Sequence, residues 1–172
     1  KQERSQLRMS TPNAFPFDLF SKPDFPAVTL KRVREQLSTP EMNMFPEDNP
    51  DFPDSLSAHL NNLKWVISGA EDLVKLECLL PTTLSYEDVS PVFHVIANEH
   101  NASAFDGRAL VGRSEEDTVE LRGDATFVTT AGMNDEQLFH ALNLAVIAAQ
   151  DALLSTLDRF NEFAHAVQES ES

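Results

Sequence analysis

The sequence predicts an α+β domain in which helices pack on one antiparallel sheet. Two observations support this fold class. Segments of alternating apolar and polar residues follow one another through short polar connections, as the strands of an antiparallel sheet do. A long amphipathic helix closes the chain, and the regular strand–helix alternation of a parallel sheet is missing. The chain has 172 residues, 41% of them hydrophobic, which is enough to bury one core.

Residues 1–26 are predicted to form an N-terminal arm, followed by a single domain at residues 27–168 and a tail at residues 169–172. Prolines interrupt any helix in the arm, and its aromatic residues are Phe15, Phe17, Phe20 and Phe25. Two interpretations stay open. The arm is either a loop held on the domain by its aromatic side chains or a segment that docks in a groove, because proline-stiffened segments lose little entropy on binding.

The first helix is predicted over residues 30–37. Thr29 can accept a hydrogen bond from the first turn as the N-cap residue. Val28 and Val33 occupy the two positions of a hydrophobic staple. Pro40 follows the predicted end of the helix, where a residue that cannot continue it is common.

Four strands are expected before the second helix, at residues 41–45, 55–60, 63–67 and 74–80. The last two are joined by a turn at residues 69–72, and Pro81 is predicted to end the fourth strand. Trp65 lies in the third strand, between Leu63 and Ile67 in the alternating pattern. In the fourth strand a period of two predicts one buried face, made of Val74, Leu76, Cys78 and Leu80.

The second helix is predicted over residues 90–101, with Ser90 as its cap and Pro91 in its first turn. A hairpin follows, with strands at residues 108–113 and 118–130. Gly123 lies in the middle of its second strand and predicts a bulge or close packing there. The core-facing side of that strand is expected to carry Val119, Leu121, Ala125 and Phe127.

The last helix begins at a variant capping box of Asn134 and Gln137 and is predicted to reach Val167. Residues on one side of this helix should cover the sheet, namely Leu138, Leu142, Ala145, Ala149, Leu153, Phe160, Phe163 and Val167. Leu144, Ile147 and Leu154 lie on the opposite side and would face water in a two-layer monomer.

An exposed apolar patch is usually covered by a partner, so we expect partner binding at Leu144, Ile147 and Leu154, with Trp65 as a further anchor. Exposure by chance, or contact with the N-terminal arm, is the alternative for the three helical residues. The partner is expected to be protein, either a second copy, a related chain or an unidentified client.

The formal net charge of −15 argues against nucleic acid and against an anionic membrane surface as partners. The charge is uneven: residues 1–38 hold seven basic and four acidic side chains, and the remainder holds six basic and twenty-four acidic ones. No run of 18 apolar residues occurs, so no membrane span is expected. No signal peptide is recognisable, and a cytoplasmic location is expected. Because the chain begins at Lys1 rather than Met, a leader removed before Lys1 stays an open alternative.

No catalytic residue, cofactor site or metal site is predicted. His94 and His100 are six residues apart and diverge around a helix, and no HExxH motif or phosphate-binding loop occurs. The acidic loop at residues 48–54 lacks the glycine and glutamate of an EF-hand. Cys78, the only cysteine, is expected to be a buried, inert thiol. The alternative is a small-ligand sensor or enzyme with a pocket near His94, Glu99 and His100.

Several segments resemble the bacterial YbjN-like family over about residues 27–165. They are Val28-Thr29-Leu30, Leu73-Val74-Lys75-Leu76-Glu77, Ile96-Ala97-Asn98-Glu99-His100-Asn101, and Gly132 followed by Asn134-Asp135-Glu136-Gln137-Leu138. The arm and the acidic insertion near residues 41–58 depart from the family pattern. The resemblance implies a fold like that of type III secretion chaperones, which are small, acidic and often dimeric, and a role in sensory-transduction regulation without catalytic residues.

Taken together, these observations predict a non-enzymatic, dimeric protein-binding module of the bacterial cytoplasm, either chaperone-like or regulatory. A structural subunit of a hetero-oligomer is a further alternative.

Overall fold

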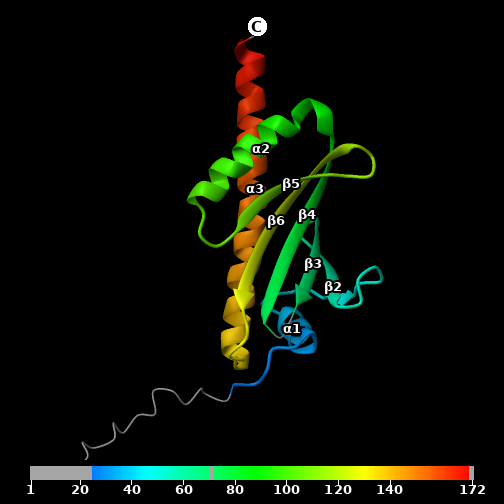
Figure 1. Ribbon diagram of the computed structural model, residues 1–172, viewed down its shortest axis with the longest axis vertical. Coiled ribbons are helices and arrows are strands. Elements are labelled where there is room, and N and C mark those ends of the chain that lie inside the picture. The colour runs from blue at the N-terminus through cyan, green and yellow to red at the C-terminus, as the bar shows by residue number, and fades with distance from the viewer. Residues whose placement is uncertain (1–24, 70–71, 171–172) are drawn as a thin grey trace, which may run out of the picture.

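The computed structural model describes residues 25–69 and 72–170, which form one six-stranded antiparallel sheet and three helices (Figure 1). The predicted α+β class, with its antiparallel sheet and long last helix, is confirmed. The strand order is β1-β2-β3-β4-β6-β5. The strands are β1 Glu47–Asp48, β2 Ser55–Leu60, β3 Leu63–Gly69, β4 Leu73–Ser85, β5 Arg108–Arg113 and β6 Thr118–Val128. The helices are α1 Leu30–Leu37, α2 Tyr86–Ser103 and α3 Asp135–Ser170.

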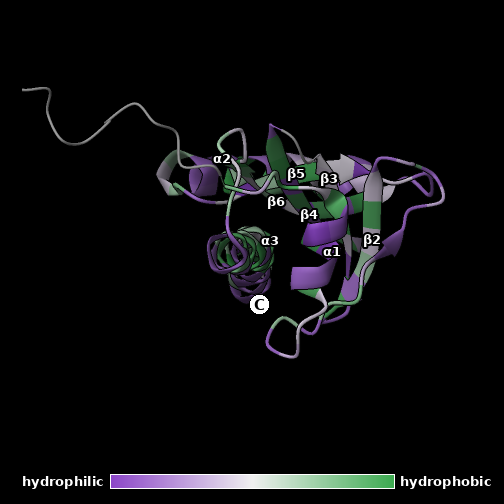
Figure 2. Ribbon diagram, turned by 90° about the horizontal axis from the view of Figure 1, so that it is seen from below, coloured by the Kyte–Doolittle hydropathy of each residue, from purple (hydrophilic) through white to green (hydrophobic). Residues whose placement is uncertain are grey.

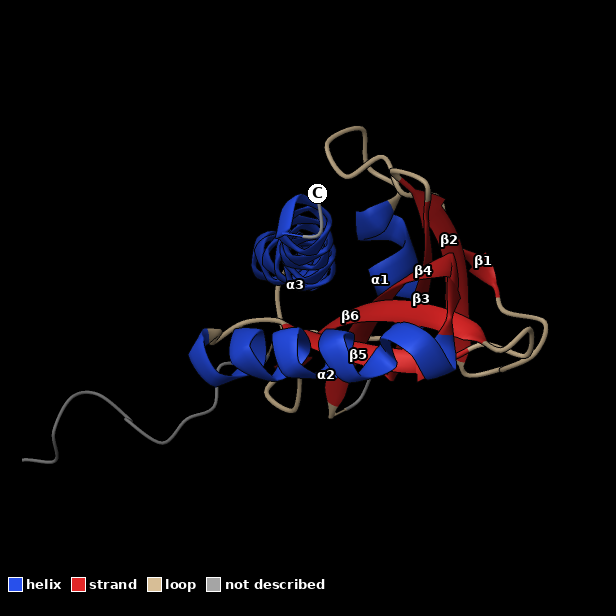
Figure 3. Ribbon diagram, turned by 90° about the horizontal axis from the view of Figure 1, so that it is seen from above, coloured by secondary structure: helices blue, strands red, loops and turns tan. Residues whose placement is uncertain are grey.

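Helices α1 and α3 lie on the same face of the twisted sheet, and α2 runs along its β5 edge (Figures 2 and 3). The core fills the space between this face and the helices. As the period of two predicts, Val74, Leu76 and Cys78 of β4 are fully buried there, while Leu80 is partly buried. The Phe93 ring of α2 stacks on Phe160 of α3, with centroids 4.0 Å apart, and this contact joins α2 to the core.

The backbone of α3 comes unusually close to the sheet, at a contact that we call the glycine–alanine seam. A Cβ atom on Gly123 of β6 would overlap the carbonyl oxygen of Ala149, and one on Gly107 would overlap that of Ala148. The Sγ of Cys78 lies 3.3 Å from the same Ala149 oxygen. The close packing predicted for Gly123 is therefore confirmed, and only glycine fits at this point.

The edge strand β5 is closed by α2 rather than left open to another chain. The side-chain amide of Asn101 donates to the carbonyl of Ala109 and accepts from its N–H, each at 2.8 Å. These two bonds satisfy the outward-facing backbone groups of Ala109, which are a template for unwanted strand pairing when they are left free.

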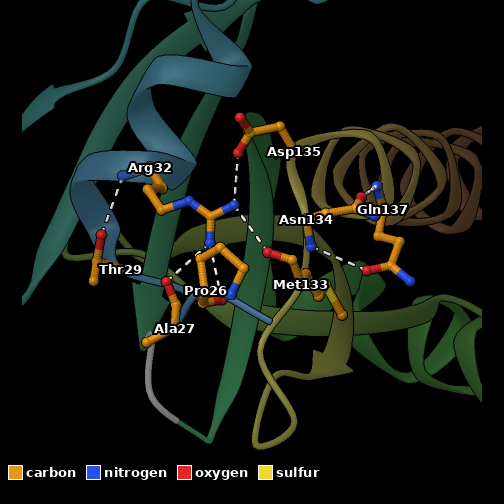
Figure 4. A network of polar contacts seen from close by, with 8 residues as sticks. All are labelled: Pro26, Ala27, Thr29, Arg32, Met133, Asn134, Asp135 and Gln137. Atoms are coloured by element: carbon orange, nitrogen blue, oxygen red, sulfur yellow. Dashed lines mark hydrogen bonds and ion pairs between the residues drawn. The ribbon is translucent and has the colours of Figure 1, made fainter. Parts of the chain in front are cut away.

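The chain enters the fold beside the first turn of α3, where Arg32 of α1 ties three segments together (Figure 4). Its guanidinium donates to the carbonyls of Pro26, Ala27 and Met133 at 3.0, 2.9 and 2.9 Å, and to the Asp135 carboxylate at 2.6 Å. Four hydrogen bonds from one largely buried side chain fix the position of residues 26–27 relative to α3.

The predicted caps of α1 and α3 are confirmed, whereas Ser90 lies inside α2 and does not cap it. The Thr29 hydroxyl accepts from the Arg32 N–H at 3.3 Å. Asn134 and Gln137 exchange two bonds, one in each direction, at 3.0 and 2.8 Å (Figure 4).

One predicted strand and several predicted boundaries are wrong. Residues 41–45 form no strand: Met42 and Met44 are buried in alternation, but the Met44 N–H donates to the Leu37 carbonyl at the end of α1. Strand β4 continues past Pro81 to Ser85, because Pro81 still pairs with Glu120 before the register shifts.

Helix α2 begins at Tyr86, not at Ser90, because the Tyr86 N–H bonds the Asp117 carbonyl and acidic residues follow in the first turn. Part of the predicted turn at residues 69–72 and most of the N-terminal arm lie outside the described residues.

Helix α3 is longer than the sheet that supports it and projects beyond the domain (Figure 1). Phe163 and Val167 were expected to face the sheet, but they are exposed because they lie on this projecting end. The helix also ends at Ser170, inside the predicted tail.

Among the helices that the structure describes, α3 is long and apolar enough to cross a membrane by length and composition alone. The sequence prediction of no membrane span rests on a stricter criterion, a run of 18 apolar residues, and it stays a prediction. Core helices of soluble proteins meet the same length and composition criterion, and α3 supplies one side of the core, with Leu138, Leu142 and Leu153 fully buried. We therefore assign α3 to the fold.

Replacement of Gly123 by alanine should destabilise the protein by about 3 kcal/mol, because the added methyl group must push α3 away from the sheet. The measurement is the free energy of unfolding in urea. Gly112→Ala on β5 is the matched control, since its nearest neighbour would be a flexible Arg122 atom at 3.4 Å. Equal stabilities for the two variants would contradict the seam.

Candidate functional site

An apolar groove runs beside α3, between this helix, the second half of β6 and the connection from α2 to β5. We call it the α3 groove. It is open to solvent and has a volume of about 550 Å³. Its lining is His100, Ala104, Phe105, Asp106, Gly107, Ala125, Thr126, Phe127, Ala141, Leu144, Ala145, Ile147, Ala148 and Asp151.

Large apolar side chains line this groove without being covered by the described part of the chain. Leu144 is 67% exposed, Ile147 57% and Phe105 fully exposed. The helical period explains the first two, because the small residues of α3 turn toward the seam and these larger ones turn away from it. Leu154, 37% exposed, continues the same side of α3 beyond the groove. The predicted exposure of all three helical residues is confirmed, and their binding of a partner stays a prediction.

Trp65 is a different case, and its assignment as a partner anchor is wrong. It is fully buried in the middle of β3, opposite Cys78 of β4, and its indole N–H donates to the Leu60 carbonyl at 3.4 Å. Its place in the alternating pattern with Leu63 and Ile67 is the signal that predicts this burial.

Phe105 and Asp106, by contrast, were missed as site residues. They lie in the short connection after α2, where an aromatic residue without periodic neighbours is the only signal in the sequence. What brings this connection to α3 is the close contact of Gly107 with the helix backbone. That contact joins residues about forty positions apart, and no local pattern encodes it.

Few polar groups face the α3 groove, and those that do are mostly acidic. Its titratable residues are His100, Asp106 and Asp151. The alternative cluster of His94, Glu99 and His100 does not converge. His94 bonds the Tyr86 hydroxyl at 3.3 Å, and Glu99 pairs with Arg159 at 3.5 Å, while His100 lines the groove. The groove therefore offers an apolar surface with an acidic rim.

Asp124 is buried on the other face of the sheet, and its charge is fully paired. Arg108 donates to both of its carboxylate oxygens at 3.0 Å, and the Lys75 ammonium lies 3.4 Å away. A buried carboxylate with these partners is a structural ion pair. It fixes the start of β5 to β6, next to the connection that carries Phe105.

The remaining chemical groups offer little reactivity. Burial raises the pKa of the Cys78 thiol to about 11, which keeps it protonated and poorly nucleophilic. Over residues 25–69 and 72–170, no three His, Cys, Asp or Glu side chains gather as metal ligands would. The absence of metal, cofactor and catalytic activity stays a prediction.

A second apolar surface, the C-terminal groove, lies between α2 and the projecting end of α3. It has a volume of about 580 Å³ and is lined by Pro91, Val92, Val95, Ile96, Glu99, Arg159 and Phe163. Val95 is 58% exposed and Phe163 49%. The Glu99–Arg159 ion pair lies at this groove, so its polar groups are already matched.

The architecture defines an acidic α+β domain whose long last helix has one side on the sheet, while the described residues leave its other side exposed. The crystal structure of YbjN from E. coli, described as a proposed transcription regulator, has this fold. The two structures superpose with a TM-score of 0.58 over 76% of this chain and 92% of YbjN, at 14% sequence identity. No protein-family model and no curated protein matches the sequence. The likeness confirms the fold that the sequence resemblance implied.

Proposed function

We propose that this chain is a non-enzymatic protein-binding module of the bacterial cytoplasm, with a regulatory or chaperone-like role, and that it binds a partner segment in the α3 groove. One observation carries the proposal: Phe105, Leu144 and Ile147 converge on one open groove and remain exposed. Contiguous exposed apolar surface of this kind marks interaction sites in proteins.

The chemistry of the groove specifies the partner segment. Apolar side chains would fill the groove, and basic residues beside them would meet Asp106 and Asp151 at its rim. The net charge of −15 favours such a partner and repels nucleic acid. YbjN is described as a proposed transcription regulator. If this chain has a regulatory role as well, its charge favours action on other proteins rather than on DNA.

Ile147→Asp should abolish capture of the partner, because it places a charge in the apolar part of the groove. Wild-type and variant chains are used as bait in extracts of the native host, and retained proteins are compared by mass spectrometry. Phe45→Asp is the control, since Phe45 is 65% exposed and lies outside the groove. The proposal predicts a protein retained by wild type and Phe45→Asp and lost from Ile147→Asp. Identical retention by all three would contradict it.

We propose in addition that the module is a dimer in which the second copy covers the C-terminal groove. The end of α3 projects beyond the sheet (Figure 1). The described part of the chain leaves Phe163 and Val167 49% and 39% exposed, and a second copy would bury them. In a twofold dimer the same patch of both copies meets itself. The C-terminal groove can do this without placing unpaired like charges together, because Glu99 and Arg159 already pair within one chain.

Light scattering at micromolar concentration should give twice the chain mass for the wild type. The double variant Val95→Glu/Phe163→Glu should give the mass of one chain, because it adds four acidic side chains across the twofold interface. A wild-type monomer, or a double variant that stays dimeric, would contradict this part of the proposal.

A further inference from the structure

The position at which the described chain begins determines where residues 1–24 can reach. The carbonyls of Phe25 and Pro26 pack against Gly132, and the Met133 N–H donates to Pro26 at 3.0 Å. Arg32 holds the Pro26 and Ala27 carbonyls at the same place (Figure 4). Residues 1–24 are therefore tethered beside the first turn of α3, the helix that forms one wall of the α3 groove.

The distances fit a contact between this tethered segment and the groove. Helix α3 rises about 1.5 Å per residue, so Leu144 and Ile147 lie about 14 and 18 Å along it from Asp135. An extended chain spans up to about 3.4 Å per residue, which lets Phe20 reach about 17 Å and Phe17 about 27 Å from Phe25. Both rings can therefore reach the exposed side chains of the groove.

The chemistry also fits. The segment supplies Phe15, Phe17 and Phe20, and residues 25–69 and 72–170 leave the apolar side chains of the groove exposed. Residues 1–24 carry four basic and three acidic side chains, whereas residues 25–172 carry nine basic and twenty-five acidic ones. The segment thus approaches the acidic rim without the repulsion that a second acidic domain would meet. The tether also keeps its local concentration near the millimolar range expected for short linkers.

We propose that residues 15–20 dock in the α3 groove of their own chain, with Phe17 and Phe20 against Leu144 and Ile147. The sequence analysis left open that the arm contacts the apolar side of the last helix. This proposal places that contact in the α3 groove.

Disulfide trapping in the full chain tests this docking. Phe20→Cys is combined with Ile147→Cys in the groove or, as the control, with Val128→Cys, which lies outside the groove and four residues from Gly132, within reach of the same segment. Ile147 and Val128 are both exposed, at 57% and 67%. The native Cys78 is buried and its pKa is raised, so it does not compete. Under mild oxidation the Ile147 pair should form an intramolecular disulfide about ten times faster than the Val128 pair, since effective concentration sets the rate.

Two results would overturn the proposal: equal rates for the two pairs, or a disulfide that links two chains, which would place the segment of a second copy in the groove. A second measurement does not depend on engineered cysteines. The methyl resonances of Leu144 and Ile147 should shift on Phe17→Ala/Phe20→Ala, because the ring currents of the docked phenylalanines are lost. Unchanged resonances would also overturn the proposal. Both measurements use the chain without a partner, so their outcome is independent of partner capture.

Discussion

The structure depends on one close contact between a helix and a sheet. The α3 backbone reaches β6 and the start of β5 at Gly123 and Gly107, where no side chain fits between them. The contact requires small residues on the inner side of α3, and Ala148 and Ala149 are those residues. Since the contact fixes which side of α3 meets the sheet, the helical period places Leu144 and Ile147 on the side that points away from the core. The exposed groove is therefore a direct consequence of how the core is closed.

The length of α3 accounts for a second exposed apolar surface. A helix of 36 residues is longer than the strands it covers, so its last turns project with Phe163 and Val167 uncovered. Asn101 of α2 also occupies the outward-facing backbone groups of Ala109, so another strand cannot pair with β5 at this point. Two apolar grooves therefore remain open to solvent over the described part of the chain, on a protein whose formal net charge is −15.

Local signals in the sequence were sufficient for most of the fold. The caps at Thr29 and Asn134, the alternation along β4 and the mid-strand glycine at 123 each encode their element with neighbouring residues alone. Predictions were wrong where a distant segment decides the outcome. Met42 and Met44 alternate like strand residues but serve to close the end of α1, and Phe163 continues the apolar stripe beyond the point where the sheet ends.

The site was predictable only in part for the same reason. Leu144, Ile147 and Leu154 follow from helical periodicity, whereas Phe105 reaches the groove through the long-range contact of Gly107. Amide hydrogen exchange along α3 tests the account most directly. If the seam anchors the helix, amides at residues 138–156 should exchange only through global unfolding, and those beyond Phe160 should exchange far faster. Rapid exchange along the whole of α3 would contradict the claim that the seam holds this helix and orients its outer side.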